Sequence, residues 1–170
     1  MTETRAPGIP TEYRGVEFRS QLEARVAILF DLLKIEWVYE PIELEGYIPD
    51  FLVQTTLYSR PRIAGPLLVE VRPALRREDF NDPIAKIARS GWTGPALVVG
   101  AAPFPSKTVW GVETTLGYAY PVVAQAHADD SSTWYAAGWI SRRRQFGMGG
   151  DDLTAAWREA TNRSKWMPPR

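Results

Sequence analysis

Residues 46–73, GYIPDFLVQTTLYSRPRIAGPLLVEVRP, contain two strand-like segments and decide the fold. The first segment, GYIPDFLV, is rich in aromatic and β-branched residues, a composition that favours a β-strand. The second segment, GPLLVEVRP, is a near-continuous apolar run between prolines, which is typical of a central strand buried on both faces. The two segments therefore predict adjacent strands, with the second near the centre of a sheet.

Regular patterns on both sides of this stretch predict helices and further strands. SQLEARVAILFDLLK, from Ser20 on, repeats apolar residues at steps of four, three and four, and Ser20 with Glu23 matches a capping box at the start of a helix. The other expected elements are a strand at 36–42, a helix at 79–90, a buried strand at 95–103, two or three peripheral strands within 108–140 and a helix at 151–166. The order α-β-β-β-α-β, followed by more strands and a helix, predicts an α/β fold with a mixed central sheet flanked by helices.

Length and composition restrict the organisation of the chain and the kinds of site it can carry. With 170 residues, 45% of them hydrophobic, we expect a flexible lead-in at 1–13, one domain at 14–166 and a flexible tail at 167–170. The sequence has no cysteine and one histidine, His127, which excludes Cys-ligated metals and multi-His zinc sites. It also has no apolar run long enough to span a membrane and no signal-peptide pattern, so we expect a cytoplasmic protein without a membrane partner.

Three acidic residues occur among apolar neighbours. Alternation along the strands places Asp50 on the face of Leu52, and Glu70 on the face of Arg72. A carboxylate beside a core strand costs several kcal/mol unless it is paired with a cation or binds one. Glu23 lies beside the apolar stripe of the first helix and can point toward the same sheet edge. Three carboxylates without histidine form an oxygen site suited to Mg²⁺ or Mn²⁺.

These residues resemble a known nuclease family. FRSQLEAR at 18–25, Pro49–Asp50 and the EVR of 70–72 together are similar to the motifs of the PD-(D/E)XK nuclease superfamily, in particular its small bacterial and phage members. The resemblance covers about residues 14–100 and implies a restriction-endonuclease-like core. It also implies that Glu23, Asp50 and Glu70 bind one or two Mg²⁺ ions that activate water for phosphodiester hydrolysis. Many small members act as dimers, so the resemblance also implies a possible homodimer.

The third motif residue departs from the family pattern. The family has a lysine where this chain has Arg72. Arginine stays protonated and cannot serve as a base, but it can orient water and stabilise charge in the transition state. Some family members take the lysine from the following helix, where this chain has Lys86.

Basic residues predict a surface for nucleic acid. Residues 60–90 hold seven basic and four acidic residues, and 139–170 hold seven and three, although the whole chain has no net charge. A nuclease needs such cations to hold phosphates beside an acidic centre. The alternative interpretation is that these basic residues form a face that is only exposed to solvent. The residues expected to contact nucleic acid are Arg14, Arg19, Arg62, Arg76, Arg77, Lys86, Arg142, Arg143 and Arg144.

The sequence therefore leads to one main hypothesis and two alternatives. The main hypothesis is a Mg²⁺-dependent endonuclease acting on DNA, with Glu23, Asp50, Glu70 and Arg72 as catalytic residues. The first alternative is a catalytically degenerate nuclease fold that binds nucleic acid or a protein. The second is a structural α/β domain in which Glu23 only caps a helix, and Glu70 and Arg72 form an ion pair on one strand.

Overall fold

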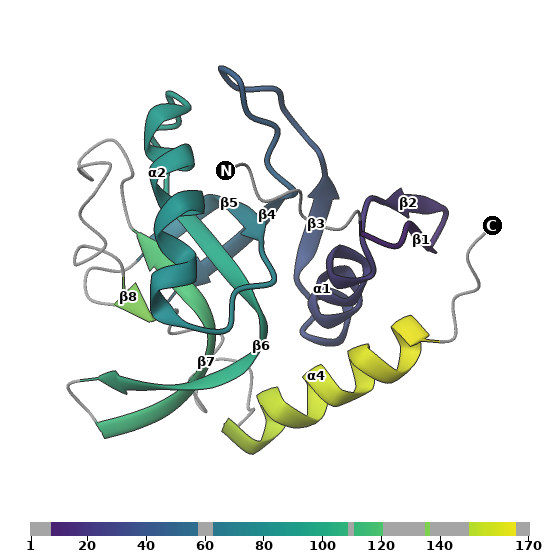
Figure 1. Cartoon of the computed structure of the whole chain (residues 1–170). Helices are drawn as coiled ribbons and strands as arrows, with labels where there is room; N and C mark the ends of the chain where they lie inside the picture. The colour runs from purple at the N-terminus through teal and green to yellow at the C-terminus, as the bar shows by residue number, and fades with distance from the viewer. Residues whose placement is uncertain (1–7, 58–62, 109–110, 121–134, 137–149, 166–170) are drawn as a thin grey trace, which may run out of the picture.

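A computed structural model describes residues 8–57, 63–108, 111–120, 135–136 and 150–165, and shows a mixed α/β fold (Figure 1). Six strands form one sheet in the order β3-β4-β5-β6-β7-β8, and β1 and β2 form a separate two-stranded sheet. The strands are β1 (Thr11–Tyr13), β2 (Val16–Phe18), β3 (Glu36–Tyr39), β4 (Phe51–Leu57), β5 (Ile63–Val71), β6 (Ala96–Thr108), β7 (Gly111–Tyr120) and β8 (Tyr135–Ala136). The helices are α1 (Gln21–Leu32), α2 (Asn81–Arg89), α4 (Gly150–Lys165) and the 3₁₀ helix η1 (Arg77–Phe80).

The sheet is mixed because a single helical connection reverses the pattern of pairing. β3, β4 and β5 pair antiparallel, whereas β5 and β6 are parallel, with Val69 beside Leu97. A parallel pair needs a crossover connection, and η1 with α2 provides it. β7 and β8 then continue the sheet in antiparallel pairing. The expected mixed sheet is therefore confirmed, and its elements from α1 to β6 follow the order expected from the sequence.

Helices cover both faces of β5, which accounts for its apolar run. Leu67, Val69 and Val71 pack with α1 and α4, the two helices that lie side by side in Figure 1. Leu68 points to the other face, where it packs with residues of η1, α2 and β6. Because both faces are buried, polar side chains fit this strand only near its end.

Two expected positions differ from the structure. Residues 11–13, which we expected in the flexible lead-in, form β1, because they pair with β2 and Thr11 is buried. β4 begins at Phe51, so Asp50 precedes the strand instead of lying inside it. Pro83 lies in the first turn of α2, where its missing N–H removes no hydrogen bond within the helix. Within 108–140, where we expected two or three strands, the structure describes β7 and β8, and residues 109–110, 121–134 and 137–140 lie outside the described residues, as does the tail at 167–170.

Among the described helices, none has the combination of length and apolarity that crossing a membrane requires.

An aromatic cluster between α1 and the sheet makes Phe51 a sensitive core position. The Phe51 ring lies 5.5 Å from that of Phe30, with the two rings perpendicular, and 5.8 Å from that of Trp37. We expect Phe51→Ala to lower the free energy of unfolding by about 3–5 kcal/mol in urea denaturation, because it leaves a cavity among these rings. Val38→Ala, at a residue that is 57% exposed on the neighbouring strand, should change the free energy by less than about 1 kcal/mol. Equal effects of the two substitutions would contradict this packing.

Candidate functional site

The strand register brings Asp50 and Glu70 to the same end of β4 and β5. The antiparallel pairing of the two strands has Phe51 opposite Val69, and Asp50 directly precedes Phe51 while Glu70 directly follows Val69. The Val71 N–H donates a hydrogen bond to Asp50 Oδ2 at 2.6 Å, which fixes the carboxylate against β5. Both acidic residues are only 1% exposed. Two like charges in this position are unfavourable unless cations lie close to them.

Glu23 joins this pair from the first turn of α1. Ser20 is the N-cap of α1: its Oγ accepts a hydrogen bond from the Glu23 N–H at 3.2 Å and donates one to Glu23 Oε1 at 2.8 Å. The Tyr39 hydroxyl donates to Glu23 Oε2 at 2.5 Å. Glu23 is therefore a capping residue whose carboxylate is buried. It also acts electrostatically on Asp50, as the pKa of Asp50 shows.

The electrostatics of Asp50 reflect burial beside other carboxylates. Burial, and to a smaller extent the charge of Glu23, raise the pKa of Asp50 to about 6. The Val71 N–H bond and the guanidinium groups of Arg72 and Arg19 act in the opposite direction without cancelling the effect. The folded protein therefore holds the ionised form of Asp50 at a cost, which an added cation would reduce.

Glu70 has two partners and one oxygen that lacks a hydrogen bond. The Tyr47 hydroxyl donates to Glu70 Oε2, and the Arg72 guanidinium forms an ion pair with Oε1. This ion pair is the one expected from their position on a single face of the strand. Even so, Oε1 accepts no hydrogen bond of normal geometry from the described residues. Because Arg72 already contacts this oxygen, a divalent cation at Glu70 would have to share it with the guanidinium or displace it.

Arg72 and Lys86 approach the carboxylates from different elements. Arg72 follows β5 directly, and its backbone N–H bonds to Val99 O at 2.9 Å, which fixes the start of the side chain. Lys86 comes from α2, and its Nζ lies 4.8 Å from the centre of the Tyr47 ring, above the residue that binds Glu70. Burial and the nearby charge of Arg72 lower the pKa of Lys86, whereas Asp50 raises it. A lysine from the following helix is thus present beside the carboxylates.

The other basic residues expected to contact nucleic acid have different partners where the structure describes them. Arg19 turns toward the carboxylates and binds Asp50 Oδ1 through Nη2 at 2.7 Å. Arg14 pairs with Asp31 at 3.0 Å, and the backbone N–H of Arg76 bonds to the Asp79 carboxylate. Arg77 is the first residue of η1, and the residues that lie outside the described part of the chain are Arg62, Arg142, Arg143 and Arg144.

Sequence reasoning missed three residues of this site. Tyr39 and Tyr47 hold the carboxylates of Glu23 and Glu70 through their hydroxyls, and burial raises the pKa of both tyrosines. Glu40 forms an ion pair with Arg19 at 2.9 Å. Nothing in the sequence distinguishes these tyrosines from core aromatic residues. For Glu40, the only signal is a charged residue directly between a strand-like segment and Pro41.

The donor atoms fit a hard divalent cation, although the carboxylates are engaged with protein groups. Within the described residues, no group of three or more His, Cys, Asp or Glu side chains is arranged so that it could hold a metal ion. Asp50 and Glu70 nevertheless offer buried carboxylate oxygens at the same end of β4 and β5. Oxygen ligands of this kind suit Mg²⁺ or Mn²⁺. Such an ion would be held by two carboxylates, in competition with Arg19 and Arg72.

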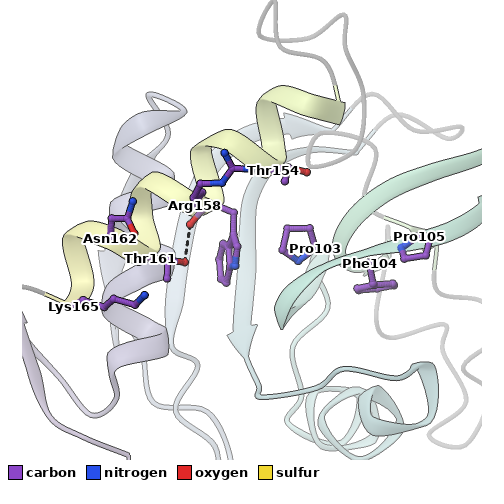
Figure 2. A pocket seen from close by; sticks show the side chains of 9 residues that line it. Pro103, Phe104, Pro105, Thr154, Arg158, Thr161, Asn162 and Lys165 are labelled. Atoms are coloured by element: carbon purple, nitrogen blue, oxygen red, sulfur yellow. Dashed lines mark hydrogen bonds between the residues drawn. The ribbon is translucent and has the colours of Figure 1, made fainter.

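A separate open pocket of about 530 Å³ lies between β6 and α4 (Figure 2). Its lining residues are Pro103, Phe104, Pro105, Thr154, Trp157, Arg158, Thr161, Asn162 and Lys165. Trp157 is buried and belongs to the core, and its carbonyl accepts a hydrogen bond from the Thr161 hydroxyl at 2.8 Å. The lining contains no carboxylate, so we place the candidate chemistry at Asp50 and Glu70.

The raised pKa of Asp50 predicts how stability changes with pH. A carboxyl with a higher pKa in the folded state than in the unfolded chain favours folding below pH 4, and this contribution is lost as pH rises through about 6. We expect Asp50→Asn to become more stable relative to wild type between pH 4 and pH 7.5, by on the order of 2 kcal/mol in urea denaturation.

Asp31 provides a control, because its pKa is shifted in the opposite direction from that of Asp50. Burial raises its pKa, but hydrogen bonds from Tyr13, Arg14 and Trp37 outweigh burial and lower it overall. Asp31→Asn should therefore lose stability relative to wild type as pH rises toward 4 from below, and should change little relative to wild type between pH 4 and pH 7.5. A constant difference between Asp50→Asn and wild type from pH 4 to 7.5 would show that burial does not disfavour the Asp50 charge.

Comparisons with protein-family models, with curated proteins and with solved structures find no match to this chain.

Proposed function

We propose that this protein is a Mg²⁺- or Mn²⁺-dependent nuclease that hydrolyses phosphodiester bonds of DNA, with a core like that of restriction endonucleases. The observation that carries the proposal is the burial of both Asp50 and Glu70 at the same end of β4 and β5. A fold rarely keeps two such charges together without a cation to bind, because their removal from water is costly.

The order of elements supports the proposed core. α1 carries Glu23, β4 directly follows Asp50, and β5 carries Glu70, after which α2 leads to the parallel strand β6. These are the places that the resemblance to PD-(D/E)XK nucleases assigns to the acidic motif residues. The same order places Lys86 on the helix after the third strand.

In the proposed reaction, each residue of the site has a separate role. Asp50 and Glu70 hold the metal ion, and the Tyr47 hydroxyl keeps the Glu70 carboxylate in position. When bound, the metal activates the attacking water and stabilises charge on the phosphate. Arg72 cannot accept a proton, so it contributes positive charge toward the phosphate. Lys86, with its lowered pKa, is the candidate for orienting the water.

A second candidate function follows from the ion pairs. Arg19 binds Asp50 and Arg72 binds Glu70, so the carboxylates have counter-cations within the protein itself. A nuclease fold that has lost hydrolysis but binds nucleic acid or a protein would keep this arrangement. This alternative predicts no stabilisation by divalent cations. For its nucleic-acid form, it predicts DNA binding that weakens with salt and needs no metal.

The metal site can be tested by thermal unfolding with and without about 5 mM Mg²⁺ or Mn²⁺. A cation that binds only the folded protein, at about ten times its dissociation constant, adds roughly 1.4 kcal/mol, which corresponds to a rise in Tm of about 3–5 °C. We expect this rise in the wild type and in Glu159→Gln, which changes an exposed carboxylate on α4. The rise should be absent in Asp50→Asn and Glu70→Gln.

The hydrolysis is tested by incubating plasmid, linear duplex, single-stranded DNA and RNA with the same proteins and Mn²⁺. We expect cleavage of DNA by the wild type and by Glu159→Gln, and none by Asp50→Asn. Metal-dependent stabilisation without cleavage of any substrate would leave the metal site in place and overturn the proposed hydrolysis. The absence of both stabilisation and cleavage would remove the proposed function.

The role of Lys86 has its own test. Lys86→Gln should reduce the cleavage rate by about 100-fold, because it removes the positive donor above Tyr47, while the metal-dependent rise in Tm stays as in wild type. Arg89→Gln, which removes an exposed basic residue from the last turn of the same helix, is the matched control. Wild-type cleavage by Lys86→Gln would exclude this lysine from the reaction.

A further inference from the structure

Arg19 occupies the position beside Asp50 that a metal ion would need. Val71 N–H is bonded to Asp50 Oδ2 at 2.6 Å, which leaves Oδ1 as the oxygen open to a cation. Arg19 Nη2 lies 2.7 Å from this Oδ1. Its Nε lies 4.0 Å from Glu23 Oε2, so the guanidinium stands between the two carboxylates. A divalent cation and Arg19 therefore compete for the same oxygen.

The backbone of Arg19 is fixed, whereas its side chain is accessible. The Arg19 N–H donates to Glu23 Oε2 at 3.2 Å and to the Tyr39 hydroxyl oxygen at 3.1 Å. These bonds hold the main chain of Arg19 to the first turn of α1 and to β3. The side chain is 55% exposed. It can therefore turn away from Asp50 without moving the helix or the sheet.

Glu40 provides a second anion for Arg19 on the solvent side. Its Oε1 lies 2.9 Å from Arg19 Nε, and its side chain is 35% exposed, against 1% for Asp50. The Glu40 N–H donates to the Asp50 carbonyl oxygen at 2.9 Å, so the main chains of the two acidic residues are hydrogen-bonded to each other. Glu40 has a φ of 44°, in the left-handed region that is unusual for a residue other than glycine. This conformation is kept immediately before Pro41.

We propose that Arg19 is a counter-cation that neutralises Asp50 before the metal binds. When the metal binds, Arg19 releases Asp50 and keeps its ion pair with Glu40. This inference rests on the proposed function, because it needs a divalent cation at Asp50 and Glu70. Arg19 is then a positioning residue that sets the affinity for the metal through competition. Glu40 supports metal binding without touching the ion, because it keeps one ion pair for Arg19 after the release of Asp50.

The test measures Mn²⁺ affinity by isothermal titration calorimetry without any nucleic acid. We expect Arg19→Gln to bind Mn²⁺ about 3- to 10-fold more tightly than wild type, because the competing cation is gone. Glu40→Gln should bind it about 3-fold more weakly, because Arg19 loses its second partner. In the double variant, the effect of Glu40→Gln should fall below about twofold. Arg163→Gln, which removes a similarly exposed arginine paired with Glu159 on α4, should bind as wild type.

The outcomes separate this inference from the proposed function. Mn²⁺ binding that depends on Asp50, but is weakened or unchanged by Arg19→Gln, overturns the inference and leaves the metal site in place. An effect of Glu40→Gln that persists in the double variant overturns it too. If neither wild type nor Arg19→Gln binds Mn²⁺ up to about 10 mM, both proposals fail.

Arg19→Lys keeps the charge on a shorter side chain and tests whether the charge itself competes with the metal. It should bind Mn²⁺ with an affinity between those of wild type and Arg19→Gln. Equal affinities of Arg19→Lys and Arg19→Gln would contradict competition by charge.

Discussion

The burial of two carboxylates at the same end of β4 and β5 is the constraint on which the rest of the site depends. Because Asp50 and Glu70 are both almost fully buried, water screens neither charge. Cations from three separate parts of the fold lie near these charges: Arg19 before α1, Arg72 after β5 and Lys86 on α2. The positions of these elements relative to the sheet therefore matter for charge balance as well as for packing.

Local patterns in the sequence predict the elements and one contact of the site. The spacing of apolar residues and Ser20 indicate α1, and the structure confirms its start. The uninterrupted apolar run of β5 predicts burial on both faces, which α1 and α4 on one side and α2 on the other provide. Alternation along β5 also predicts the ion pair of Glu70 with Arg72, because residues two apart on a strand share a face.

The remaining contacts join residues distant in sequence, so no local rule reveals them. Arg19 reaches Asp50 across 31 positions, and Tyr47 reaches Glu70 across 23. Both contacts depend on the path of residues 40–50 between β3 and β4. Glu40 illustrates the difficulty, because a left-handed conformation before a proline runs against local preference and is set by tertiary contacts. The displacement of Asp50 to the position before β4 has the same origin.

Charge balance also connects metal binding with substrate binding. Among the described residues of the site, the four carboxylates of Glu23, Glu40, Asp50 and Glu70 lie near the three cations of Arg19, Arg72 and Lys86, so the cluster has a net charge of about −1. A divalent cation added to this partly buried cluster would leave excess positive charge, which is unfavourable at low dielectric. Two events can restore the balance: the movement of Arg19 toward solvent, or the arrival of a phosphodiester anion. Under the proposed function, a metal and a nucleic-acid phosphate would therefore each strengthen the binding of the other at this site.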